Sequence, residues 1–470
     1  MTAPPQPLRL GTSSGRWVVA TTVMGTGVAM LNGTDVSVAL PDLGADLDAS
    51  VAALQWVLNG YMLTLASLIL VGGSLADRFG RRRIYLLGVA WFTVASVLCA
   101  LAPSSGWLIA ARILQGVGGA LLTPGSLAIL QSCFHPDDRA TAIGAWSGLT
   151  GIAAVIGPVV GGLLVDAFGW RAVFFLPLPL AIAVIWAGSR HVPESRDPAS
   201  PRLDWPGALL TVAGLGTSSY AIIAYPESGW SAAVVAATVS GLVFLVGFVV
   251  RERVAADPML PLSVFRSRQF TAANLITFVV YAALGGVFFM LIVHLQTVVG
   301  YSATGAGAAT MPVSGLLLVG SPLMGRVMQR IGPRLPLTVG NALLAAGMLM
   351  MMTIREGSTY LGGVLPPLLV FGVGLTLMVT PVTATVLSAI EDRFSGLASG
   401  VNNAVARTGQ LLAVAALPVA AGLTGGDFAD PVAFAAGFRI AMVVSAVLTG
   451  LGALLAWTMI RNPATADTQA

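Results

Sequence analysis

The sequence predicts an all-α protein that crosses a membrane many times. Of its 470 residues, 56% are hydrophobic and only 9% are charged, and the mean hydropathy is +0.86. An ordinary soluble domain carries about 25% charged residues, so a soluble fold is excluded. The 55 glycines agree with this class, because small residues let helices pack closely in lipid.

Fourteen segments are apolar over the roughly 20 residues that a membrane-spanning helix needs. The first is too long for the core of a signal peptide and lacks a small-residue cleavage site, so we expect it to remain in the protein. In chain order the predicted spans are 17–40, 54–75, 84–102, 107–130, 141–165, 173–188, 206–225, 230–250, 272–298, 306–326, 335–354, 360–388, 398–423 and 434–460.

The charged loops predict how these helices are oriented. All 24 basic residues are arginine, a composition typical of a GC-rich bacterial gene. Nineteen arginines lie in the loops on the side that carries both chain ends, three lie on the other side, and two lie within helices. Loops rich in arginine stay in the cytoplasm, so we expect a multi-pass protein of the bacterial inner membrane with both termini cytoplasmic.

An internal repeat predicts the domain organisation. Gly73 to Arg83 follows the second span, and the similar segment Gly325 to Arg334 follows the tenth. Eight helices separate the two copies, so they share one orientation and predict a parallel repeat of two halves. The predicted parts are a tail 1–16, a six-helix half 17–188, a loop 189–205, two inserted helices 206–250, a loop 251–271, a second six-helix half 272–460 and a tail 461–470.

Several function classes are excluded by composition. Without lysine there is no Walker A loop, which excludes ATP-driven pumping by this chain. The three histidines are scattered, so we expect no metal site, and the loops are too short to form a folded domain. We expect no cofactor beyond a proton gradient and no nucleic-acid partner. The expected partners of this monomer are the lipid bilayer, protons and a small-molecule substrate.

The segment after the second span carries a spaced pattern of glycines and charges. Its members are Gly73, Asp77, Arg78, Gly80 and Arg81. A positively charged cytoplasmic loop explains the arginines but not this spacing. The segment resembles the loop 2–3 signature of the major facilitator superfamily. That resemblance implies two halves that rock against each other, with Asp77 helping to latch them together on the cytoplasmic side.

Further segments resemble one branch of that superfamily, the fourteen-helix drug:proton antiporters. They are 31–41 in the first helix, 112–120 in the fourth, 151–162 in the fifth, and the shorter stretches 170–171, 296–302 and 396–407. The resemblance implies a transporter and not an enzyme. It implies export of hydrophobic, often cationic compounds, such as drugs and antibiotics, in exchange for protons.

The fifth-helix segment contains Gly151, Gly157, Pro158, Gly161 and Gly162. Glycines three or four residues apart leave one face of a helix as nearly bare backbone, and the proline removes one backbone hydrogen bond. The resemblance assigns this motif to antiporters. Helix packing alone and gating between the halves both explain it.

Arg112 and Asp35 are charged residues inside predicted spans. An arginine there costs roughly 2.5–3.5 kcal/mol on insertion scales and needs a partner. Both residues are predicted about 7–8 Å below the outer membrane boundary, so we expect them to form an ion pair, either purely structural or coupled to protons. Asn32 occupies the position of the family's aspartate. Asp35 therefore either takes over proton coupling, or coupling is altered or absent.

The remaining candidates are less specific. Asn32, Tyr61, Trp146, Tyr281, Phe289 and Met378 are candidates for a substrate cavity, although each is also explained by packing. The resemblance favours an interface role for Arg407, with substrate contact as the alternative. An uptake symporter is the nearest competing function, and the glycine-proline motif of the fifth helix argues against it. An intramembrane lipid-handling enzyme would need a nucleophile or metal cluster that the sequence does not display.

Overall fold

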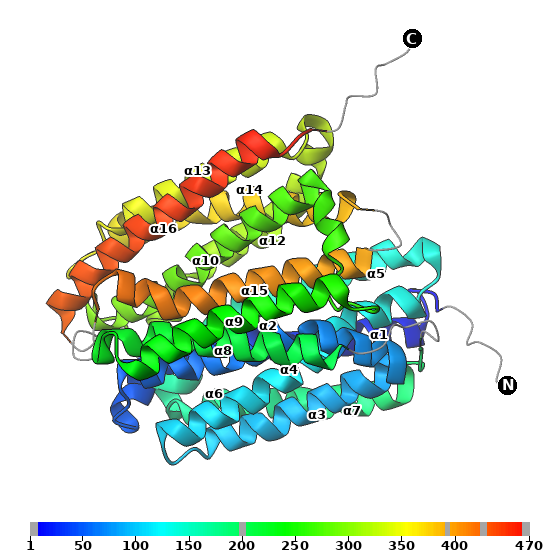
Figure 1. The fold of residues 1–470 in the computed structure, drawn as a ribbon, viewed down its shortest axis with the longest axis horizontal. Helices are drawn as coiled ribbons and strands as arrows, with labels where there is room; N and C mark the ends of the chain where they lie inside the picture. The colour runs from blue at the N-terminus through cyan, green and yellow to red at the C-terminus, as the bar shows by residue number, and fades with distance from the viewer. Residues whose placement is uncertain (1–7, 197–203, 391–394, 424–429, 463–470) are drawn as a thin grey trace, which may run out of the picture.

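The computed structural model describes residues 8–196, 204–390, 395–423 and 430–462. Within the helices, the structure does not describe the side chains of residues 33–34, 136, 140, 147–148, 151–155, 329 and 395–397. The described part is built from helices that run roughly side by side (Figure 1). The predicted tails and the loop 189–205 lie partly outside the described residues.

The first half of the chain forms one bundle, shown in blue to teal in Figure 1. Its last span is broken between two short helices, where Pro177 starts the second of them. The helices are α1 (Ser13–Asp46), α2 (Val51–Phe79), α3 (Arg81–Ala100), α4 (Ser105–Cys133), α5 (Pro136–Phe168), α6 (Arg171–Phe175) and α7 (Pro177–His191).

The second half forms a matching bundle. Its helices are α10 (Arg268–Thr297), α11 (Ala303–Ala309), α12 (Met311–Ile331), α13 (Arg334–Met351), η2 (Tyr360–Val364), α14 (Leu365–Ser388), α15 (Ser395–Ala420) and α16 (Pro431–Met459). Between the halves lie α8 (Trp205–Ser228), α9 (Ala232–Val254) and the short helix η1 (Leu262–Arg266).

The two halves repeat the same packing. In the first half α2 and α3 pack on α4, and α1 packs on α5; in the second half α12 and α13 pack on α14, and α10 packs on α15. The contacts between the halves repeat as well, because α5 packs on α11 and α12 while α2 packs on α15. This agrees with the parallel repeat that the sequence predicts.

Both ends of the described chain lie at the same end of the molecule (Figure 1), which we call the terminal face. The opposite end is called the far face. Eleven helices in the described part are long and apolar enough to cross a membrane. The long helices α1, α5 and α15 run beside them, but the count of fourteen spans stays a prediction.

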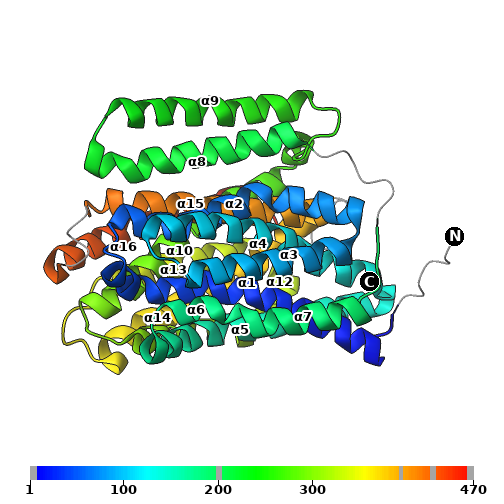
Figure 2. The ribbon, with the colours of Figure 1, turned by 90° about the horizontal axis from the view of Figure 1, so that it is seen from below.

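The inserted helices lie outside the two bundles. Figure 2 shows α8 and α9 together on one side of the molecule. α9 packs on α8, and α8 packs on both α2 and α15, where the two halves meet. In the most apolar 18-residue stretch of α9, only 17% is buried within the protein. This helix therefore presents most of its surface outward.

Most helices begin before the apolar span predicted for them. The reason is that hydropathy marks only the apolar part of a helix, whereas the helix itself starts at a polar cap. Ser50, Ser104 and Ser267 each accept a hydrogen bond from a backbone N–H in the first turn of the helix that follows, which stabilises those starts.

Candidate functional site

A buried polar cluster lies in the first half, centred on Arg112 of α4. Arg112 is 1% exposed. Its Nε donates to the carbonyl oxygen of Val57 on α2 at 2.9 Å, and its Nη1 donates to the side-chain oxygens of Asn32 and Gln115. Its guanidinium carbon lies 4.5 Å from the ring centre of Tyr61. The described contacts hold this positive charge with neutral oxygens and an aromatic face.

The cluster extends across the bundle through Gln115. The amide nitrogen of Gln115 donates to the hydroxyl of Ser96 on α3 at 2.6 Å. The hydrogen bonds of Arg112 and Gln115 therefore link α1, α2, α3 and α4 at one depth. Such a network fixes the rotation of α4 relative to its neighbours, because turning the helix would leave a buried charge without its acceptors.

The described contacts of Arg112 do not include the predicted partner Asp35. Among the described contacts of Arg112, the residue that α1 contributes is Asn32. Asp35 lies three residues further along, about 60° away round the helix, and it faces α5. A Cβ placed on Gly161 would lie 2.8 Å from the Cβ of Asp35, so the bare backbone at Gly161 makes room for this buried residue.

The candidates for a substrate cavity do not form one group in this conformation. Phe289 and Met378 lie in the packed core of the second half, at 3% and 0% exposure. Trp146 on α5 donates to the hydroxyl of Thr26 on α1 at 3.2 Å, so it joins two helices of the first half. Tyr61 belongs to the Arg112 cluster, as does Asn32.

Arg407 lies on α15, which packs on α10 of its own half and on α2 of the first half. Its Nη1 donates to the side-chain oxygen of Gln410 at 3.1 Å. The interface role of Arg407 stays a prediction.

The turn after α2 is bound within its own half. Gly80, at φ +114°, occupies a region that side chains disfavour, and its backbone lets the carboxylate of Glu194 approach. Asp77 pairs with Arg81 at 2.7 Å, and the backbone N–H of Arg81 donates to the carbonyl of Ser195. In this conformation the described partner of Asp77 is therefore Arg81 and not a residue of the second half.

The other two members of this segment also have neighbours in the first half. Gly73 lies against Pro124, and Arg78 lies over the ring of Phe79.

At the far face, α5 and α11 meet backbone to backbone. A Cβ on Gly162 would lie 2.5 Å from the Cα of Thr304, and a Cβ on Gly307 would lie 2.1 Å from the carbonyl oxygen of Pro158. The carboxylate of Asp166 accepts a hydrogen bond from the backbone N–H of Thr304 at 3.0 Å. We call this contact the far-face seam. Gly157 is buried beside it, while the surroundings of Gly151 lie outside the described residues.

Other hydrogen bonds between the halves lie toward the same end. Gln55 on α2 donates to the carbonyl of Val414 on α15 at 3.3 Å, and Gln296 on α10 donates to the carbonyl of Val38 on α1 at 3.1 Å. In the part of the chain that the structure describes, the hydrogen bonds that join the halves are thus concentrated toward the far face. The halves are fastened there.

Sequence reasoning missed several of these residues. Asp166, Gln55 and Gly307 are not among the residues that the sequence analysis singles out. The signal for Gly307 was present in the run of small residues 303–309, which mirrors the small residues of α5. No comparable signal identifies Gln55, because its acceptors are backbone carbonyls far along the chain.

Comparison with known proteins identifies the family. Residues 19–414 match the profile of the Major Facilitator Superfamily. The chain belongs to this superfamily. Solved structures agree with the fold of the superfamily. A bacterial homologue of the human lysosomal transporter Spinster superposes with a TM-score of 0.69 over 95% of this chain and 97% of that one, at 18% sequence identity.

Among its relatives, this member of the superfamily is similar to three proteins named for antibiotics. It is 35% identical to the probable actinorhodin transporter of Streptomyces coelicolor, over 87% of this chain and 74% of that protein. It is 34% identical to the tetracenomycin C resistance and export protein of Streptomyces glaucescens, over 86% and 75%. It is 35% identical to the methylenomycin A resistance protein of Bacillus subtilis, over 95% of each chain.

Proposed function

We propose that this protein exports small amphipathic or hydrophobic compounds, antibiotics among them, across the bacterial inner membrane by proton antiport. The observation that carries the proposal is the similarity to antibiotic resistance and export proteins, which for the methylenomycin A resistance protein extends over 95% of both chains. The fold supports it, because two matching halves that meet along a shared interface are suited to alternating access.

The arginine distribution and the far-face seam together give the direction of opening. The arginine-rich loops lie at the terminal face, which we assign to the cytoplasm. The seam closes the opposite end, so we infer that compounds reach this state from the cytoplasmic side. Compounds enter from that side, and the seam must separate before they leave.

Asp35 is the proposed proton carrier, and Arg112, which contacts Asn32 about one turn away on the same helix, is its proposed partner in proton coupling. Asp35 touches α5 at Gly161, and the next residue, Gly162, touches α11. Successive residues of a helix point about 100° apart, so α5 lies between the carboxyl group and the seam. A change of charge on Asp35 alters what α5 packs against, and a shift of α5 loosens the seam. This links proton binding to opening.

A vesicle assay tests the proposed function. In everted membrane vesicles with an acidic interior, adding a substrate to the bath should release protons from the interior, because each exported molecule exchanges for protons. The readout is recovery of a quenched acridine dye, across a panel of lipophilic cations and antibiotics. Vesicles without the protein are the control. No dye recovery with any compound on the panel would contradict proton-coupled export, and proton-coupled uptake of a compound by intact cells would instead favour the symporter.

Orientation is tested by cysteine labelling. Cysteines placed at Ser104 and Ser228, both exposed at the far face, should react with an impermeant maleimide on intact cells. A cysteine at Asp257, exposed at the terminal face, should react only after the cells are permeabilised. The native Cys99 and Cys133 are buried, so the background is low. Labelling of the variant at Asp257 on intact cells would reverse the assigned orientation.

The latch proposed for Asp77 predicts a partial loss of transport. Asp77→Asn should lower the transport rate roughly five- to tenfold without loss of membrane insertion, because it weakens a contact needed in only part of the cycle. Asp137→Asn is the matched control, since that side chain is 70% exposed and also pairs with an arginine at the terminal face. Equal rates in both variants would leave only a local packing role for Asp77.

A further inference from the structure

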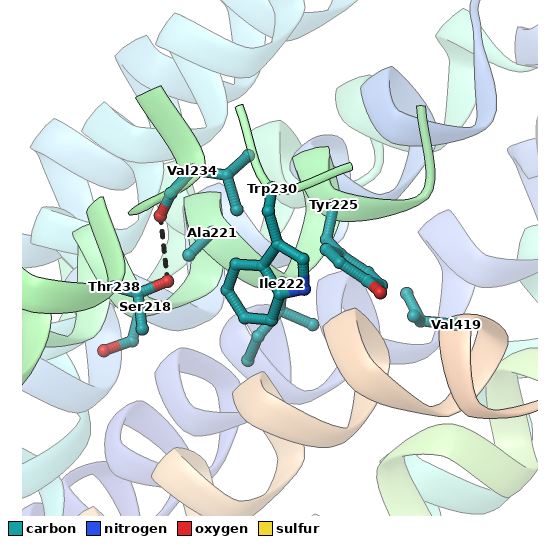
Figure 3. Close-up of a pocket in the computed structure, with 8 residues that line it drawn as sticks. All are labelled: Ser218, Ala221, Ile222, Tyr225, Trp230, Val234, Thr238 and Val419. Atoms are coloured by element: carbon teal, nitrogen blue, oxygen red, sulfur yellow. Dashed lines mark hydrogen bonds between the residues drawn. The ribbon is translucent and has the colours of Figure 1, made fainter. Parts of the chain in front are cut away.

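A pocket lies away from the far-face seam, between the inserted helices and α15 of the second half. Its volume is about 380 Å³. The described residues that line it are Ser218, Ala221, Ile222 and Tyr225 of α8, Trp230, Val234 and Thr238 of α9 or the turn before it, and Val419 of α15. Figure 3 shows Trp230 and Tyr225 side by side at this pocket, with Val419 close to Tyr225.

The pocket is a slot that runs along the helix axes. On α8 its lining extends over seven residue steps, from Ser218 to Tyr225, which corresponds to about 10 Å at 1.5 Å per residue. Its deep end is closed where a Cβ on Gly241 of α9 would lie 2.6 Å from the hydroxyl oxygen of Ser218. α15 forms the third wall through Val419.

The chemistry of the lining is apolar and uncharged. None of the eight described lining residues carries a charge. The hydroxyl of Thr238 already donates to the carbonyl of Val234 at 2.8 Å (Figure 3). At the mouth, the rings of Tyr225 and Trp230 are tilted by 60° with their centres 5.1 Å apart, and the two residues are 39% and 67% exposed. Such aromatic side chains mark the level of lipid headgroups.

We propose that this slot binds one acyl chain of a phospholipid from the far-face leaflet, with the headgroup at Tyr225 and Trp230. A narrow apolar slot parallel to the membrane normal matches an extended hydrocarbon chain. The slot opens at the outward-facing pair α8 and α9, away from the seam, which favours a bilayer lipid over transported cargo. The bound chain joins α9 to α15, and so ties the inserted pair to the second half.

A photoreactive lipid tests the site. The full-length protein is reconstituted with phosphatidylglycerol that carries a diazirine in one acyl chain, irradiated, and digested for mass spectrometry. We expect adducts concentrated in segment 218–238. Ala221→Phe should lower them about tenfold by filling the slot, whereas Val243→Phe, on the exposed face of α9, should leave them unchanged. Thr238→Leu, which narrows the deep end, is the second filling variant if Ala221→Phe does not fold.

Two outcomes would overturn the proposal. Adducts spread evenly over the outward faces of α8 and α9, unaffected by the filling variants, would mean ordinary contact with bulk lipid. Loss of the adducts on addition of a lipophilic cation such as tetraphenylphosphonium would mean that the slot takes transported compounds instead. Both readouts are independent of transport, so a failure of the exporter proposal leaves this test intact.

Discussion

Asp35→Asn should abolish proton-driven efflux while leaving substrate binding measurable. The asparagine keeps the size of the side chain beside Gly161 but cannot carry a proton, and a buried carboxyl group in a spanning helix is functional by default. Transport driven by a pH gradient in reconstituted vesicles should fall at least about tenfold, to the level of vesicles without protein. Binding is followed separately by equilibrium dialysis of a radiolabelled compound.

Two further variants make this result specific. Glu227→Gln removes an exposed carboxylate at the far face and should transport normally. Asn32→Asp combined with Asp35→Asn returns a carboxyl group to the position where the family has one, now in direct contact with Arg112, and we expect partial recovery. Full pH-driven transport by Asp35→Asn alone would remove the carrier role and leave Asp35 as a packing residue of α1 against α5.

Gly162→Ala should disable the far-face seam. The added Cβ would lie 2.5 Å from the Cα of Thr304, so the halves cannot close as they do here. Overpacking of this kind costs about 1–3 kcal/mol, which shifts a two-state equilibrium roughly 5- to 150-fold. We expect transport to fall by a factor in this range and the protein to spend more time open at the far face.

The matched control lies on the same helix. Among the described residues, none lies within 4 Å of the position of a Cβ added to Gly144, so Gly144→Ala should transport at the normal rate. Opening is measured by the rate at which a cysteine at Thr304 reacts with a maleimide in the two backgrounds. Equal labelling and equal transport in Gly162→Ala and Gly144→Ala would show that closure of α5 on α11 is not part of the transport cycle.

The sequence predicts the helices well, because membrane insertion is decided locally. In lipid, the backbone N–H and C=O groups of a spanning helix must pair within that helix, and its surface must be apolar. A run of about 20 apolar residues therefore suffices to identify it. The repeat of Gly73 to Arg83 in Gly325 to Arg334 likewise identified two halves of equal orientation, and the structure has the same helix pairs in both. Of the α5 glycines that the sequence singles out, Gly161 and Gly162 lie at close contacts.

The sequence does not predict which side chains meet across helices. Depth along a helix follows from counting residues, so Arg112 and Asp35 were placed at similar levels. Whether they touch depends on the rotation of α1 about its axis, and that rotation is set by packing against α4 and α5 together. The structure turns Asn32 toward Arg112 and Asp35 toward Gly161. One turn of helix separates the predicted partner from the observed one.

By itself, the amino-acid sequence determined the class of the protein, its helices, its two-fold repeat and the close approach of α5 to a neighbour, since these follow from composition and local spacing. Tertiary structure alone decided that Asp166 and Gln55 fasten the far face, that Phe289 and Met378 are packed in the core, and that α8 and α9 leave an apolar slot. The physical reason is that these features depend on the relative rotation and height of helices hundreds of residues apart, which no local pattern encodes.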